Sequence, residues 1–149
     1  MDDEYALCIS GSDQIWNISL KDFSEGFMLP GLKKTRRISY AVSVGDRGLE
    51  SDNEALKQRV RSYMVSYDML SAREDVAIRE IEAFCGRKPE YVLDPVFLLD
   101  ENEWNQALPC PRQIEGDYIF FYTVNYDSEA IRMAQAISRH VGLPLVVLY

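Results

Sequence analysis

The chain has 149 residues, of which 47% are hydrophobic and 27% charged, and its net charge is −8. This composition is typical of a globular protein with one good core or pieces of two domains, and the negative charge argues against a general affinity for nucleic acid or an anionic membrane. No apolar run approaches the roughly 20 residues that span a bilayer, and the acidic start Met1–Glu4 is unlike a signal peptide, so we expect a cytoplasmic protein without an integral membrane segment.

Strand-like and helix-like segments alternate along the chain, which predicts βαβ units and a largely parallel sheet. The expected strands lie at 5–9, 36–43, 68–71, 90–93, 118–124 and 144–149. The first of them, Tyr5–Ile9, is continuously apolar, which predicts a strand buried on both faces with Cys8 inside. The three cysteines are odd in number and lack C-x-x-C spacing, so we expect neither a disulfide framework nor a metal site.

Four helices are expected between and after these strands. A capping box, Ser-x-x-Glu, predicts the start of the first helix at Ser51, and the helix should run to about Val65. The second should cover 74–85 and stop at Gly86, and the third should cover 100–108. In the fourth, after Asp127 or Ser128, the inner face should comprise Ile131, Ala134 and Ile137.

The stretch from Pro109 to Arg112 has the composition of a domain linker. It divides the chain into two α/β parts, 1–112 and 113–149, and the second of them comprises a single βαβ unit. A lone βαβ unit cannot bury both faces of its strands. We therefore expect the chain to be an internal fragment of a longer protein, inactive by itself and able to self-associate.

A cluster of small and polar residues directly follows the first strand. Gly11 lets the backbone turn and approach a ligand, while Ser12, Asp13 and Gln14 supply a hydroxyl, a carboxylate and an amide. Open α/β sheets bind ligands just beyond the carboxyl ends of their strands, so these residues predict a binding loop. The alternative is a helix start in which Ser12 or Asp13 serves as a cap.

Two further strand ends carry candidate site residues. Arg73 lies between a strand and a helix, where a guanidinium and helix N–H groups can bind an anion, or it pairs with Glu74 or Asp75 instead. Ser43 either faces a ligand or satisfies neighbouring backbone groups. For Asp94, before Pro95, we predict a structural turn or cap.

Four ordered motifs resemble the polysaccharide pyruvyl transferase family: Gly11-Ser-Asp-Gln-Ile-Trp-Asn17, Ile38-Ser-Tyr-Ala-Val-Ser-Val-Gly45, Leu70-Ser-Ala-Arg-Glu74 and Val92-Leu-Asp-Pro-Val96. This resemblance implies a GT-B-like two-domain parent with doubly wound, mostly parallel Rossmann-like sheets. In that parent, 1–112 would be the major part of the N-terminal Rossmann-like domain without its first strand, and 113–149 the opening βαβ unit of a second, truncated domain. The resemblance also implies transfer of a pyruvyl group from phosphoenolpyruvate to a sugar or lipid-linked saccharide, without a cofactor. Asp13 and Arg73 would be catalytic, whereas Gly11, Ser12, Gln14 and Ser43 would bind substrate.

The resemblance implies that the general acid is a histidine of the second domain, outside this stretch of chain. The only histidine here, His140, ends the last helix and suits a surface position. Two other classes of protein stay open. A GT-B-type glycosyltransferase would share the architecture, and a non-catalytic sugar-binding or scaffold protein would keep the fold without the chemistry. Peripheral attachment of the parent protein to the inner membrane also stays open.

Overall fold

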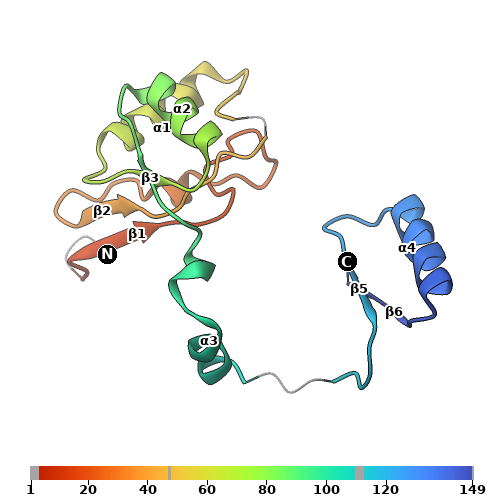
Figure 1. Cartoon of the computed structure of the whole chain (residues 1–149). Coiled ribbons are helices and arrows are strands. Elements are labelled where there is room, and N and C mark those ends of the chain that lie inside the picture. Colours follow the sequence, from red (N-terminus) through yellow and green to blue (C-terminus); the bar gives the residue numbers. More distant parts are fainter. Residues whose placement is uncertain (1–3, 47, 110–112, 149) are drawn as a thin grey trace. The chain divides into compact units, whose positions relative to one another are not determined.

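The computed structural model describes residues 4–46, 48–109 and 113–148, so Cys110, Pro111 and Arg112 of the predicted linker lie outside the described residues. The chain forms two compact units, residues 1–106 and residues 107–149 (Figure 1). Each unit is built from short parallel strand pairs and helices, so the protein is mixed α/β, as the alternation of segments predicts.

Parallel strands run through the first unit in chain order. β1 (Leu7–Ser10) pairs with β2 (Arg36–Ser39), and β3 (Ser71–Ala72) pairs with β4 (Glu90–Tyr91). Two isolated parallel bridges, Ile38 to Met69 and Val42 to Ala72, connect β2 with the β3 segment. Because every pairing is parallel, the loops that follow these strands leave from the same edge.

Two helices lie on the same side of these strands in Figure 1, α1 (Glu54–Val65) and α2 (Asp75–Cys85). The predicted stop of α2 is confirmed, since Gly86 has φ 75° and its N–H donates to the carbonyl of Glu82. The predicted start of α1 is wrong by three residues. Asn53 is the N-cap and its side chain accepts from the Leu56 N–H, whereas Ser51 accepts from the Asn53 N–H.

The core of the first unit lies between the strands and these two helices. Val60 and Met64 of α1 and Ala77 and Ile81 of α2 are buried there. Each helix therefore turns one apolar face toward the core. The ring of Trp16 joins this core and meets Tyr67 edge to face, with 5.3 Å between ring centroids.

The prediction that Tyr5–Ile9 is buried on both faces is wrong. Leu7 is 42% and Ile9 57% exposed, and Cys8 is half-buried. β1 pairs only with β2, and the helices of the first unit cover one face of the strands, so alternate side chains of β1 face outward. Within the described residues no helix covers that second face, and the doubly wound sheet therefore stays a prediction.

All six described strands are shorter than predicted, and β2 is shortened the most. β2 ends at Ser39 instead of residue 43, because Ala41 takes a left-handed backbone conformation with φ 53° that interrupts the ladder. β3 is displaced toward the predicted strand's carboxyl end and comprises only Ser71 and Ala72. Between the β1 and β2 strands lies a 3₁₀ helix, η1 (Glu25–Met28), and after β4 lie η2 (Pro95–Leu98) and α3 (Glu101–Ala107).

The second unit is a βαβ element in which β5 (Ile119–Tyr122) pairs in parallel with β6 (Leu145–Leu148). The connecting helix α4 (Ser128–Val141) is capped by Asp127, as predicted, and ends at Gly142. Ala134 is buried, but the prediction for Ile137 is wrong, since this side chain is 54% exposed. The reason is the small size of the unit, whose two strands cover only part of the α4 surface.

Among the described residues no helix has the length and apolar character needed to cross a membrane. A search of the same residues finds no group of three or more His, Cys, Asp or Glu side chains arranged to hold a metal ion.

Candidate functional site

The candidate site begins with the loop after β1, which is fixed against the segment after β2. The Tyr40 N–H donates to the Ser10 carbonyl over 2.9 Å, and the Ser43 N–H donates to the Asp13 carbonyl over the same distance. Gly11 has φ 152°, and a Cβ atom there would lie 1.9 Å from the Tyr40 carbonyl oxygen. Only glycine therefore permits this close approach of the two loops.

A second glycine makes the same kind of contact from the other loop. Gly45 has φ 70°, and a Cβ atom there would lie 2.3 Å from Asn17 Nδ2 and 2.6 Å from Gln14 Oε1. These two amides are hydrogen-bonded, since Asn17 Nδ2 donates to Gln14 Oε1 over 3.2 Å. The loop that presents Asp13 and Gln14 is thus held by backbone and side-chain bonds.

Ser43 is buried, and its hydroxyl is already engaged. It donates to Glu74 Oε2 over 2.8 Å and accepts from the Gly45 N–H over 3.1 Å. The residue therefore links the loop after β2 to the start of α2. In this arrangement it serves neighbouring protein groups, which is one of the two roles that the sequence left open.

Arg73, directly after β3, is surrounded by carboxylates. Its Nη1 pairs with Asp94 Oδ2, its Nε lies 3.3 Å from Glu74 Oε1, and its Nη2 lies 3.3 Å from Asp13 Oδ1. Three different guanidinium nitrogens thus contact three different carboxylates, and the cluster carries a net charge of −2. Asp13 is the most accessible partner, with 82% of its side chain exposed, whereas Asp94 is only 27% exposed.

Asp94 has two functions in this arrangement. Its side chain caps η2 by accepting from the Val96 N–H over 3.0 Å, so the predicted structural cap is confirmed, and it also pairs with Arg73. The Val96 N–H and the neighbouring guanidinium lower the pKa of Asp94 against a smaller opposing effect of burial. Burial lowers the pKa of Arg73, but the hydrogen bonds that its guanidinium donates to Asp94 and Glu74 outweigh this effect, and the pKa is raised. Arg73 is therefore held as a permanent cation.

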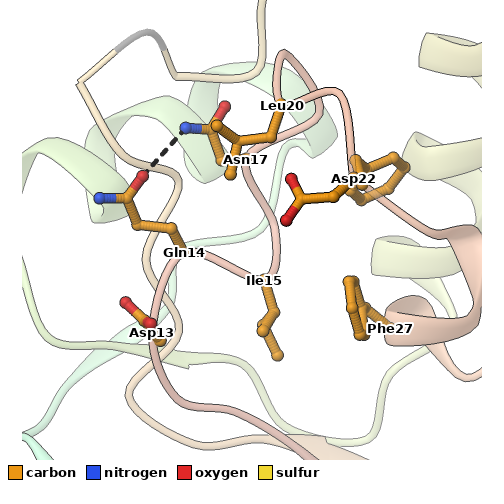
Figure 2. A pocket seen from close by; sticks show the side chains of 8 residues that line it. Asp13, Gln14, Ile15, Asn17, Leu20, Asp22 and Phe27 are labelled. Carbon is orange, nitrogen blue, oxygen red and sulfur yellow. Dashed lines mark hydrogen bonds between the residues drawn. The ribbon is translucent and has the colours of Figure 1, made fainter. Parts of the chain in front are cut away.

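A pocket of about 160 Å³ opens beside Asp13 (Figure 2). Its walls are formed by Asp13, Gln14, Ile15, Asn17, Leu20, Asp22, Phe23 and Phe27. In Figure 2 the Asp22 carboxylate points toward the middle of the view, and Ile15 lies between Asp13 and Phe27. The pocket thus combines two carboxylates and two amides with apolar side chains.

The structure brings together most of the residues that the sequence predicts for the site. Gly11–Gln14, Ser43 and Arg73 follow three neighbouring parallel strands and are joined by the contacts above, although Ser12 itself takes part in none of them. Sequence reasoning missed the contact of Asp94 with Arg73 and the pocket residues Asp22 and Phe27. The signal for the last two was the long loop from 17 to 34, since long loops in compact units are often functional.

Fold and geometry together define an α/β protein with a cluster of polar and charged side chains at the carboxyl ends of parallel strands, the edge where such folds bind ligands. A family model described as polysaccharide pyruvyl transferase matches residues 3–149, and the chain belongs to this family. No curated protein and no solved structure matches the chain.

Proposed function

We propose that the chain takes part in moving a pyruvyl group from phosphoenolpyruvate to two hydroxyls of a sugar in a cell-surface polysaccharide or its lipid-linked precursor. The product is a cyclic pyruvate ketal. Membership of the polysaccharide pyruvyl transferase family carries this proposal. The contact between Asp13 and Arg73 supports it, because it joins a group suited to a sugar hydroxyl with a group suited to an anionic donor.

At the donor, the reaction breaks the C–O bond to phosphate and the π bond of the C=C group, and it forms two C–O bonds and one C–H bond. Protonation of the methylene carbon of phosphoenolpyruvate turns it into a methyl group and makes the neighbouring carbon electrophilic. One sugar hydroxyl attacks that carbon, phosphate leaves with its bonding electron pair, and the second hydroxyl closes the ketal. Of the two hydroxyl protons, one balances the proton gained by the methyl group and the other leaves with hydrogen phosphate.

Arg73 binds a phosphate or carboxylate oxygen of the donor and stabilises the charge on the departing phosphate. Asp94 and Glu74 hold its guanidinium through Nη1 and Nε, while Nη2 contacts the exposed Asp13 at 3.3 Å. Of the three carboxylates, Asp13 has the most exposed side chain, so its contact with Arg73 is the easiest for a ligand to replace. A donor oxygen therefore replaces Asp13 at Nη2, and Asp13 is released to orient or deprotonate a sugar hydroxyl.

The remaining site residues position these two groups. Gly11 permits the close packing of the loop, and Ser12 and Gln14 offer a hydroxyl and an amide to the substrate. Ser43 acts through Glu74, to which its hydroxyl donates, and so sets the position of a carboxylate that holds Arg73. The general acid comes from outside the residues discussed here.

The test is phosphate release from phosphoenolpyruvate by the polypeptide that carries this sequence, with and without a saccharide acceptor. We expect acceptor-dependent release and a product whose mass increases by one ketal-linked pyruvyl group. Release of a nucleoside diphosphate from a nucleotide sugar under the same conditions would assign a glycosyltransferase instead. Sugar binding without either reaction would assign a non-catalytic sugar-binding protein.

A further inference from the structure

The pocket beside Asp13 has a chemistry that differs from that of the Arg73 cluster. Of the described residues that line it, none is Lys, Arg or His, and two are aspartates. An anion such as phosphoenolpyruvate would meet the Asp22 carboxylate there, and Arg73, the cation that contacts Asp13, is not among the lining residues. The pocket is thus unsuited to the donor.

The same groups are suited to a neutral, hydroxyl-rich ring. Carboxylates accept hydrogen bonds from hydroxyls, and an amide can both donate and accept. Asp13 and Asp22 supply the acceptors and Gln14 supplies an amide, while Leu20 and Phe27 are 43% and 41% exposed and offer apolar surface to ring C–H groups. Small-molecule sites commonly combine apolar walls with a few placed polar groups in this way.

The size of the pocket limits its occupant. Its volume of about 160 Å³ is below the roughly 300 Å³ at which sites for drug-sized ligands begin. One sugar ring matches this space better than a nucleotide does. The pocket is therefore a site for a single ring of a saccharide rather than for a nucleotide sugar.

The walls of the pocket are fixed to the rest of the unit. Ser10 Oγ donates to the Phe27 carbonyl over 2.6 Å and accepts from Trp16 Nε1 over 3.1 Å. At the start of η1, Glu25 accepts from Arg59 Nη2 over 2.8 Å and from the Tyr63 hydroxyl over 2.9 Å. The loop that carries Asp22 and Phe27 is thus anchored before any ligand binds, which lowers the entropic cost of binding.

We propose that this pocket binds one neutral pyranose ring of the acceptor saccharide, with Asp22 accepting a hydrogen bond from a ring hydroxyl and Phe27 contacting the apolar face of the ring. The assignment of this ring to the acceptor rests on the proposed function. Asp13 lies both in the pocket and 3.3 Å from Arg73 Nη2, so a hydroxyl bound there lies next to the place of the donor.

The test is a titration of the full isotope-labelled chain with methyl glucoside, methyl galactoside and methyl mannoside, followed by amide NMR shifts. Phosphoenolpyruvate and inorganic phosphate serve as anionic probes. We expect at least one glycoside to shift signals of the 13–27 loop and the anions to leave the Asp22 and Phe27 signals unchanged. Asp22→Asn should weaken glycoside binding about tenfold, because a hydrogen bond to a charged acceptor is lost.

The matched control is Asp117→Asn, which removes an exposed carboxylate of the second unit. Unchanged glycoside affinity in a folded Asp22→Asn variant, relative to Asp117→Asn, would overturn the proposal. So would the absence of any glycoside-induced shift up to tens of millimolar in the folded wild-type chain, or anion-induced shifts at Asp22 and Phe27. Glycoside binding that depends on Asp22, without pyruvyl transfer, would support the pocket assignment and contradict the proposed function.

Discussion

Replacing Arg73 with lysine distinguishes the contribution of this residue to stability from its contribution to the rate of the reaction. The guanidinium contacts Asp94, Glu74 and Asp13 through three different nitrogens, whereas a lysine has one nitrogen on a flexible stem. Lysine can keep one strong contact at a time, so two are weakened. Ion pairs of partly exposed side chains contribute about 0.2–1 kcal/mol each, and Asp13, at 82% exposure, is at the lower end.

We therefore expect Arg73→Lys to lower the free energy of unfolding by about 1 kcal/mol. For a unit of this size that corresponds to a melting temperature lower by about 4–8 °C. Turnover should fall much further, by about a hundredfold, because loss of a placed contact to a departing anion costs on the order of 3 kcal/mol. The assay is phosphate release from phosphoenolpyruvate with acceptor by the full polypeptide that carries this sequence, measured well below both melting temperatures.

Arg79→Lys is the matched control, since Arg79 is an exposed residue of α2 and its replacement should change stability by less than about 0.5 kcal/mol. Near-normal turnover in a folded Arg73→Lys variant would remove Arg73 from the reaction and leave it an ion-pair centre. A stability loss of several kcal/mol would show instead that the three carboxylates depend on the guanidinium more strongly than their exposure indicates.

Three further predictions concern the fold. Gly11→Ala should lower the free energy of unfolding, measured by chemical denaturation, by about 3 kcal/mol or more, because the added Cβ atom clashes with the backbone. The control Gly31→Ala should cost only about 1 kcal/mol, since Gly31 has φ 78° but open space around it. Equal losses in the two variants would contradict the close packing of the loops after β1 and β2. Burial raises the pKa of Tyr67 to about 12, so the neutral phenol stabilises the fold fully below about pH 10, and wild type should lose about 1 kcal/mol by pH 10.5. Tyr67→Phe should lose this alkaline component while Tyr5→Phe, at an exposed position, keeps it. The apolar surface of the second unit should cause concentration-dependent self-association in sedimentation, and a monomer at all concentrations would contradict that expectation.

Local signals in the sequence determined the helices and the order of the strands. The stop of α2 at Gly86 follows from a backbone conformation that glycine adopts without strain, and the cap at Asp94 follows from a carboxylate next to proline. The start of α1 shows the limit of such signals, because Ser51, Asn53 and Glu54 all suit a helix start and only the packed structure selects Asn53. Competing caps differ by less energy than the tertiary contacts that choose between them.

The tertiary structure decided which side chains are buried and which polar groups contact one another. The apolar run of β1 is compatible with burial on one face or both, and the number of neighbouring strands and covering helices decides which side chains are exposed. The sequence placed Asp13, Ser43 and Arg73 at the ends of strands, but it could not show that Asp94 completes the carboxylates around Arg73 or that Ser43 is engaged by Glu74. These two contacts join residues 21 and 31 positions apart. They depend on which strands lie side by side, and that pairing is a property of the whole unit and not of any segment.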